Sequence, residues 1–412
     1  MHKNKYLILI TSSYPNARGE EFIEEEIPYL LEKFEEILIV CNSPKTLEKE
    51  LDPRIRVVYY PYQSVRGSLK SLFGLSSLIF WKEIFSFIRL FKKAPGIQVF
   101  KAALISLYNG KKLESFLEKL LKKGKLIDRN ELFTYSYWLN DAALGLILLK
   151  EIIPGVKTVS RAHGWDVYFE QHPNNYLPYR SFLFNKLDKI CFISDHGKKY
   201  TENKFGKRSN FMVSYLGISN TSEFKKNCLT EKLNLVSCSA IIPLKRILAI
   251  ISSLAEINDI KINWKHIGDG VEKEETILQA KEMLDNKENI EFDFPGYFPN
   301  EEIKRFYSEN IVHAFINVSA FEGIPVTFME AMSFGIPVIA PNVGGISEIV
   351  NQYNGILMSP APSKIEIADS IRTLVKMNRE EYGQLRRNAY ETWNLKFNAS
   401  TNYTKFVEMI CN

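Results

Sequence analysis

The sequence of 412 residues has no hydrophobic run long enough to cross a membrane. No stretch reaches the eighteen or more apolar residues that a transmembrane helix needs. Residues 1–5 are polar and the apolar run 6–10 is too short for the core of a secretory leader. These two absences predict a cytoplasmic protein.

Cysteine is scarce and scattered. The five cysteines are odd in number and show no metal-ligand spacing: Cys41, Cys191, Cys228, Cys238 and Cys411. This pattern argues against a disulfide framework and predicts reduced thiols. The formal net charge of +5 is mild and no nucleic-acid-binding motif accompanies it, so no nucleic-acid partner is expected. No Asp-x-Asp motif is present, so we expect no metal cofactor.

Apolar runs suited to buried strands alternate with helical segments in both halves of the chain. The length exceeds one ordinary core and favours two domains. The first series predicts strands at residues 6–11, 37–41, 56–60, 132–136, 158–162, 190–193 and 211–215. A second series begins at residue 233, with strands at 233–239, 262–267 and 290–294. This alternation predicts an α/β fold class, with parallel sheets covered on both faces.

The most informative stretch is residues 319–341, SAFEGIPVTFMEAMSFGIPVIAP. The run 314–318 predicts a strand, Pro325 the start of a helix and Gly335 its end, before another strand. The helix start would direct unpaired N–H groups beyond the strand ends, which suits a phosphate. Glu322 and Glu330 flank this point and can accept hydrogen bonds from sugar hydroxyls. A carboxylate at a helix N-terminus plus one solvated glutamate is the alternative.

The spacing from Glu322 to Glu330, followed by AMSFGIPVIA and by VGG and EIV near residues 343–350, resembles the C-terminal signature of family 4 of the retaining glycosyltransferases. The resemblance implies the GT-B architecture, two Rossmann-like domains facing across a cleft. It places Glu330 on the ribose of a nucleotide sugar and Glu322 on the transferred sugar. The implied donor-binding set also includes Tyr297, Gly323, Ile324, Pro325, Val326 and Thr327.

Residues 239–246, SAIIPLKR, follow the first strand of the second series. The family usually has Gly-Arg and then Lys-Gly here, and both basic side chains hold the diphosphate. Lys245 matches this pattern, whereas Ala240 stands where the arginine is expected. The missing guanidinium could be supplied by Arg246, at the usual glycine position, or by the basic end of another loop. A solvated basic pair at a helix start is the alternative.

Two further candidates follow strands of the first half. Gly19 ends the loop 12–19, before a helix predicted over residues 20–34, and can bring backbone close to donor phosphates. His163 follows the strand 158–162, where imidazole can position a hydroxyl or take up a proton. The resemblance places His163 at the reacting end of the donor sugar. Without it, a turn glycine and a structural histidine explain both residues.

Residues 64–125 are rich in Lys, Leu and Phe, with helical periodicity over 69–91 and 111–123. Basic residues lie among the aromatics: Lys70, Lys82, Arg89, Lys92 and Lys93. Such helices suit contact with an anionic membrane, and an ordinary helical insertion with a solvated basic face is the alternative. The predicted domains are 1–220, which contains this insertion, and 232–396. A helix within 397–412 is expected to cross back to the first domain.

These features predict a retaining, metal-independent glycosyltransferase with a UDP- or GDP-linked donor. Lys245, Arg246 and the helix start near Pro325 would stabilise the departing diphosphate, while His163 and Glu322 hold the sugar. Residues 13–30 resemble a subgroup that builds exopolysaccharide and lipopolysaccharide, so a glycan or lipid-linked acceptor at the inner face of the membrane is expected. A nucleotide-sugar epimerase of GT-B fold and a non-catalytic nucleotide-sugar-binding protein are the alternatives.

Overall fold

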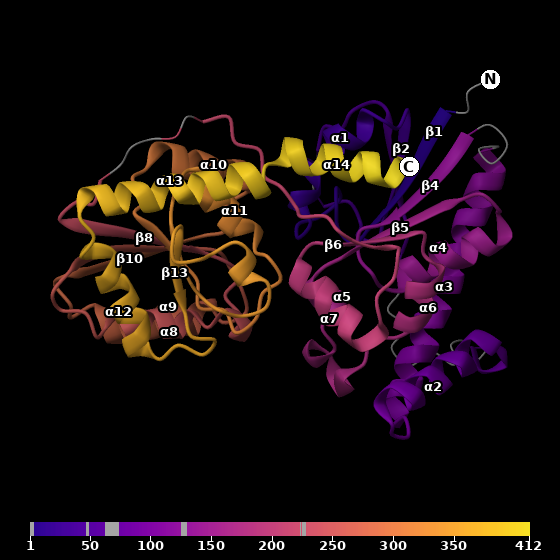
Figure 1. The fold of residues 1–412 in the computed structure, drawn as a ribbon, viewed down its shortest axis with the longest axis horizontal. Helices are drawn as coiled ribbons and strands as arrows, with labels where there is room; N and C mark the ends of the chain where they lie inside the picture. The colour runs from indigo at the N-terminus through magenta and orange to yellow at the C-terminus, as the bar shows by residue number, and fades with distance from the viewer. Residues whose placement is uncertain (1–3, 47–48, 62–73, 125–129, 223, 225–227) are drawn as a thin grey trace. The chain divides into compact units, whose positions relative to one another are not determined.

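The computed structural model describes residues 4–412 except 47–48, 62–73, 125–129, 223 and 225–227. The chain divides into two compact units (Figure 1). Unit 1 contains Met1–Ser214 and Tyr403–Asn412, and unit 2 contains Tyr215–Asn402. The backbone therefore passes from one unit to the other at two points, one after residue 214 and one after residue 402.

Unit 1 is built on a seven-stranded parallel sheet in the order β3-β2-β1-β4-β5-β6-β7. The strands are β1 (Asn4–Thr11), β2 (Glu36–Cys41), β3 (Ile55–Tyr59), β4 (Asn130–Ser136), β5 (Lys157–Ala162), β6 (Lys189–Phe192) and β7 (Phe211–Val213). All seven lie where the apolar runs predicted them. The strand order reverses between β1 and β4, so the loops after these two strands diverge at a topological switch point, where ligands of such sheets bind.

Both faces of this sheet are buried, which is why its strands are nearly continuous apolar runs. Along β1, Leu7 and Leu9 face one core and Ile8 and Ile10 face the other. The helices of unit 1 are α1 (Ile27–Leu31), α2 (Leu78–Phe91), α3 (Ile97–Gly124), α4 (Asp141–Ile152), α5 (Gly164–Val167), α6 (Arg180–Lys186) and α7 (Asp195–Phe205), with the C-terminal part of α14 (Ala399–Cys411).

The prediction of one helix over residues 20–34 is wrong. The structure has a 3-10 turn, η1 (Glu21–Glu25), followed by the five-residue α1. Pro28 lacks the N–H that a continuous helix would need at that position. Glu20 and Glu26 are moreover buried rather than solvated in a first helical turn. The long N-terminal helix that was expected to face a phosphate is therefore absent.

The predicted insertion contains α2 and α3, and α3 begins well before the expected residue 111. Residues 64–73 and 125 of this insertion lie outside the described residues, as do residues 225–227. In the part of the chain that the structure describes, no helix is both long and apolar enough to cross a bilayer.

Unit 2 is built on a six-stranded parallel sheet in the order β10-β9-β8-β11-β12-β13. The strands are β8 (Lys232–Cys238), β9 (Lys261–Ile267), β10 (Ile290–Gly296), β11 (Ala314–Ile316), β12 (Val338–Pro341) and β13 (Gly355–Met358). The helices are α8 (Ile247–Leu254), α9 (Lys273–Leu284), α10 (Asn300–Glu309), α11 (Val326–Ser333), α12 (Lys364–Val375) and α13 (Arg379–Lys396). Two Rossmann-like α/β units confirm the predicted fold class.

The strand order of unit 2 also reverses, here between β8 and β11. The chain builds outward from β8 through β9 to β10 on one side, and from β11 through β12 to β13 on the other. The loops that follow β8 and β11 therefore lie on either side of the switch point of this sheet, where ligands bind. Lys245 lies in the first of these loops and Glu322 in the second.

Candidate functional site

Lys245 and Glu322 form an ion pair at the switch point of unit 2. Lys245 Nζ lies 2.5 Å from Glu322 Oε1, and the two side chains are only 20% and 12% exposed. The loops that carry them are also joined by backbone, because Ala320 N donates to Leu244 O at 2.9 Å. A cation and a carboxylate from residues 77 positions apart in the sequence are thus placed side by side beyond the strand ends.

Two glycines hold the Glu322 loop from its other side. Gly345 N donates to Glu322 O at 3.3 Å and to Gly323 O at 3.0 Å. Gly344 has φ +54, and a Cβ added there would lie 1.8 Å from Glu322 O. Only a residue without a side chain permits this approach, so the two glycines fix the backbone that carries Glu322.

The helix α11 begins at this loop. Pro325 is its N-cap, and the N–H groups of Val326 and Thr327 belong to the first turn, where no intrahelical acceptor exists. Ile324, which is 3% exposed, anchors the entry to the helix. An N-terminus at a strand-order reversal, beside a lysine, is suited to an anion.

Glu330 lies on α11 and is 2% exposed. Burial raises the pKa of the Cys238 thiol at the end of β8, and the negative charge of Glu330 raises it further. Burial also raises the pKa of Tyr307 well above its usual value, and electrostatic interactions with Cys238 and Glu330 raise it further. Glu330 is therefore a buried carboxylate close to β8, which excludes the alternative of a solvated glutamate.

Arg246 and Tyr297 were also predicted to bind the donor. Arg246 adopts a left-handed backbone conformation, with φ +50, and its Nε donates to Val318 O at 2.6 Å. Its guanidinium is thus bonded to the backbone of the loop that follows β11. Tyr297 follows Gly296 at the end of β10, two strands from β8 in the sheet order. The expected donor contacts of both residues stay predictions.

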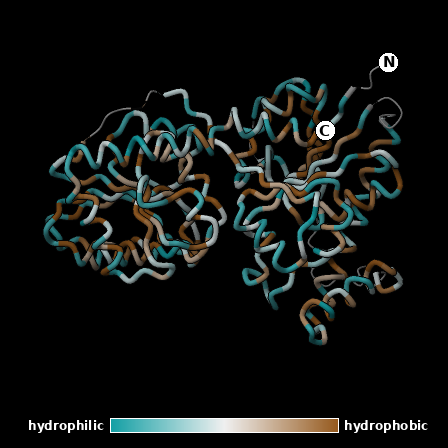
Figure 2. Tube along the Cα trace, viewed as in Figure 1, coloured by the Kyte–Doolittle hydropathy of each residue, from teal (hydrophilic) through white to brown (hydrophobic). Residues whose placement is uncertain are grey.

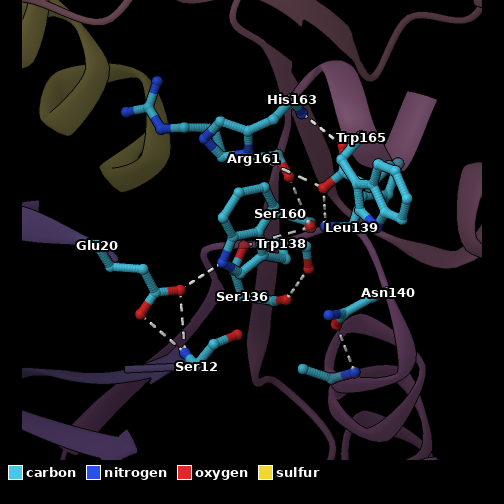
Figure 3. Close-up of polar contacts among 12 residues, drawn as sticks. Ser12, Glu20, Ser136, Trp138, Leu139, Asn140, Ser160, Arg161, His163 and Trp165 are labelled. Carbon is cyan, nitrogen blue, oxygen red and sulfur yellow. Dashed lines mark hydrogen bonds and ion pairs between the residues drawn. The ribbon is translucent and has the colours of Figure 1, made fainter. Parts of the chain in front are cut away.

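The loop after β1 in unit 1 is organised around a carboxylate that the sequence analysis did not select. Glu20 accepts the backbone N–H groups of Ser12 (2.9 Å), Ser13 (2.6 Å) and Tyr14 (2.9 Å). The indole of Trp138, from the loop after β4, also donates to it (Figure 3). Glu20 is 2% exposed and ties together the two loops of the switch point.

This arrangement changes what the Gly19 loop offers to a donor. The N–H groups of residues 12–14 are taken by Glu20, and Gly19 N donates to Glu21 at 2.9 Å. A phosphate would have to compete with a buried carboxylate for these donors. In the sequence, Glu20 follows Ser12 and Ser13 at the end of the first strand, and this could have indicated its role. Its position before an apolar segment instead favours the first turn of a helix.

His163 follows β5 and lies between two aromatic rings. Its ring centroid is 4.8 Å from that of Tyr137 and 4.5 Å from that of Trp138. The residue is 7% exposed, and neither ring nitrogen has a hydrogen-bond partner among the described residues. Burial lowers the pKa of His163, although Asp166 opposes the shift, so the imidazole is neutral near pH 7. A buried neutral imidazole has one nitrogen that donates and one that accepts, and with neither of them bonded it is suited to bind a hydroxyl group.

Asp166 orients the loop that carries His163. Its carboxylate accepts His163 N at 2.5 Å and Leu139 N at 2.7 Å. His163 Nδ1 is 3.9 Å from Asp166 Oδ2, too far for a hydrogen bond. The aspartate thus holds the backbone, and neither ring nitrogen of His163 is bonded to it.

A cavity of about 320 Å³ lies at the carboxyl ends of β1, β2 and β4. Asp141, at the start of α4, is fixed there by Asn109 Nδ2 at 2.9 Å and by the Ser106 hydroxyl. The polar lining residues are Ser12, Asn42, Ser43, Asn109, Asn140 and Asp141. Amide, hydroxyl and carboxylate groups can exchange hydrogen bonds with a molecule that carries several hydroxyls.

Comparison with known proteins places this site in context. Residues 219–392 match the family model described as Glycosyl transferases group 1. The glycosyltransferase WcaL of Escherichia coli K12, named for colanic acid biosynthesis, is 24% identical over 246 residues, which are 57% of this chain and 59% of WcaL. Lipopolysaccharide 1,6-galactosyltransferase of the same organism is 32% identical over 120 residues, 28% of this chain and 32% of that protein. The alignment thus spans less than two thirds of either relative.

Solved structures match the whole chain in fold. Anabaena Alr3699/HepE in complex with UDP and glucose has a TM-score of 0.67 at 17% identity, with 100% of both chains covered. Sucrose-phosphate synthase from Thermosynechococcus elongatus has a TM-score of 0.70 at 15% identity, with 98% of both chains covered. At these identities the likeness concerns the fold, and it extends over both units.

Proposed function

Because residues 219–392 match the model described as Glycosyl transferases group 1, and the fold of both units matches that of a solved glycosyltransferase, we propose that the chain transfers a sugar from a nucleotide-sugar donor to a glycan or lipid-linked acceptor, with retention of configuration. The observation that carries this proposal is the Lys245–Glu322 pair beside the start of α11. The names of two relatives, which refer to colanic acid biosynthesis and to lipopolysaccharide, further support a role in polysaccharide synthesis.

In unit 2, the donor diphosphate would take the Lys245 ammonium from Glu322. An ammonium group pairs with a dianionic diphosphate more favourably than with one carboxylate, because the opposing charge is larger. The N–H groups at the start of α11, from Val326 and Thr327, would share the negative charge. Glu322, released from its partner, would then accept hydrogen bonds from the sugar. The buried Glu330 would accept the ribose hydroxyls of the nucleoside.

In unit 1, the neutral imidazole of His163 would hold a hydroxyl of the transferred sugar. The polar cavity near Asp141 would hold the acceptor. The acceptor oxygen forms a bond to the anomeric carbon as the bond from that carbon to the diphosphate oxygen breaks, on the same face of the sugar. The acceptor proton passes to the departing phosphate oxygen. Lys245 and the helix start stabilise the charge that develops on that phosphate.

The remaining donor contacts follow from the same placement. Gly323, Ile324 and Pro325 shape the loop between Glu322 and α11, and we assign them to the donor by position. Arg246, Tyr297 and Gly19 are assigned by resemblance alone. UDP is the first nucleotide to test, because solved neighbours in fold contain UDP or UDP-glucose.

The experiment begins with thermal-shift screening of the purified protein against UDP- and GDP-sugars, since a ligand of the folded state raises the melting temperature. Lys245→Ala should abolish the shift, whereas Lys281→Ala, an exposed lysine of α9, should preserve it. Unchanged donor binding by Lys245→Ala would contradict the phosphate assignment.

Product analysis then separates the three candidate activities. Incubation with the donor and a glycan or lipid-linked acceptor should yield a product whose anomeric configuration, measured by NMR, matches that of the donor. Isomerisation of the sugar without acceptor would indicate an epimerase. Donor binding without turnover of any acceptor would indicate a binding protein. Activity that persists after dialysis against a chelator is expected, and its loss would contradict metal independence.

A further inference from the structure

The helix α2 carries an exposed apolar stripe on the side opposite its buried residues. Its inner side buries Phe80, Ile84 and Phe87. On the outer side, the exposed large apolar residues are Leu78 (77%), Trp81 (42%), Phe85 (67%) and Ile88 (41%). Their spacing of three or four residues aligns them along one face of the helix. Figure 2 shows this segment as a largely apolar stretch of the tube, at the α2 label of Figure 1.

Positive charge borders this stripe. Lys82, Arg89 and Lys92 are exposed on the same helix or at its C-cap. No acidic side chain within the described residues forms an ion pair with any of the three. The one carboxylate of α2 belongs to Glu83, which is buried and accepts the Tyr176 hydroxyl at 2.8 Å. The outer face therefore combines apolar side chains and cations without an opposing charge.

The helix that presents this face is firmly held. The ring of Phe87 meets that of Tyr176 edge-on, with centroids 5.3 Å apart. Ser86 donates to the Ser181 hydroxyl of α6 at 3.0 Å. The indole N–H of Trp81 donates to Leu75 O at 2.8 Å, which fixes its ring. The stripe is thus a preformed surface rather than a frayed segment.

We propose that this face of α2, defined by Leu78, Trp81, Phe85 and Ile88 with its cationic border, docks on an anionic lipid bilayer. Apolar side chains would enter the boundary between headgroups and acyl chains, and Lys82, Arg89 and Lys92 would contact lipid phosphates. The Trp81 ring suits this boundary because it is large and apolar, and its N–H already donates to Leu75 O, so entry of the ring leaves no polar group unpaired. The charge complementarity favours lipid over an apolar protein partner. The docking would bring a lipid-linked acceptor to unit 1, and in that respect it rests on the proposed function.

The test is cosedimentation of the whole protein with vesicles of phosphatidylcholine alone or mixed with phosphatidylglycerol. The wild type should bind the mixed vesicles more tightly than the neutral ones, and added salt should weaken binding. Leu78→Ser with Phe85→Ser should weaken binding about a hundredfold, about tenfold for each apolar side chain. Lys82→Gln, Arg89→Gln and Lys92→Gln together should remove the preference for anionic lipid, at about fivefold for each cation.

Matched controls lie in unit 2, where exposed leucines and lysines are available. Leu278→Ser with Leu395→Ser removes comparable apolar area, and Lys281→Gln, Lys376→Gln and Lys396→Gln remove three cations. Both controls should bind vesicles as the wild type does. Equal losses in the controls, or no binding of the wild type to anionic vesicles, would overturn the proposal. A dimer that dissociates with Leu78→Ser would overturn it as well, in favour of a second copy of the chain.

The vesicle assay contains no donor, so its outcome is independent of the transferase proposal. The α2 variants should retain the donor-induced thermal shift and turnover of an acceptor free in solution. Vesicle binding without any transfer would leave the docking surface intact and refute the proposed function alone.

Discussion

Gly344→Ala tests whether the Glu322 loop is held by the close approach of two backbones. The added Cβ would lie 1.8 Å from Glu322 O, whereas ordinary contacts begin near 3.4 Å, so one segment must move by about 1.6 Å. Misplacement of a catalytic group by about 1 Å can cost a hundredfold in rate. We therefore expect kcat/KM to fall at least about a hundredfold.

A second glycine serves as a control that distinguishes the effect of this steric collision from the effect of backbone strain. Gly206 ends α7 with φ +81, and a Cβ added there meets nothing within 4 Å. Both alanine variants place a side chain at positive φ, and Gly206, with ψ 160, lies in a region that almost only glycine adopts, so alanine there costs about 1–3 kcal/mol. Gly206→Ala should lose about that much stability and keep its activity.

The measurements are urea unfolding, donor-induced thermal shift and initial rates of transfer for both variants and the wild type. Gly344→Ala should remain folded and show the rate loss together with a weaker donor shift. If Gly344→Ala turned over donor as fast as Gly206→Ala, the contact between the two loops would not position Glu322, and the reasoning would be refuted.

Three further predictions concern buried polar groups of unit 1. His163→Ala should lower kcat at least about a hundredfold. It should also lower the urea midpoint, because the buried ring loses its contacts with Tyr137 and Trp138, so kcat is measured where the variant is fully folded; an unchanged kcat would argue for a packing role alone. Burial raises the pKa of Glu83 to about 7, so its contribution to stability is full below the unfolded pKa near 4.5 and is lost as the pH rises through 7. At pH 8 the free energy of unfolding of Glu83→Gln should thus exceed that of the wild type by up to about 3 kcal/mol, and the difference should vanish at pH 4. Arg161→Met removes the ion-pair partner of the buried Glu26, which lies 2.8 Å away, and should lower the free energy of unfolding in urea by about 3–5 kcal/mol. Adding Glu26→Leu to this variant should restore most of the loss. Additive losses from the two substitutions would show that the two residues are uncoupled.

The α/β class and every strand of unit 1 were predictable because a strand buried on both faces must be apolar at nearly every position. The Glu322–Glu330 motif was equally visible, since its glycines and prolines mark the turns around it. The helix over residues 20–34 failed for the converse reason. A run of glutamates before an apolar segment looks like a solvated first turn, and nothing local shows that Glu20 and Glu26 are buried.

The partners of charged groups required coordinates. Glu20 collects N–H groups from a loop that precedes it and an indole 118 residues later. Lys245 and Glu322 were each identified singly, but their contact depends on the order in which β8 and β11 lie in the sheet.

The amino-acid sequence alone determined which segments become strands, where the turns lie and which residues are the candidate acidic and basic groups. These features depend on the residue itself and on its neighbours in the chain. Tertiary structure alone decided which of these groups meet, which are buried, and that one side of α2 is left uncovered. Hydrogen bonds and ion pairs between distant segments depend on sheet order and on the packing of loops, and no local pattern encodes either.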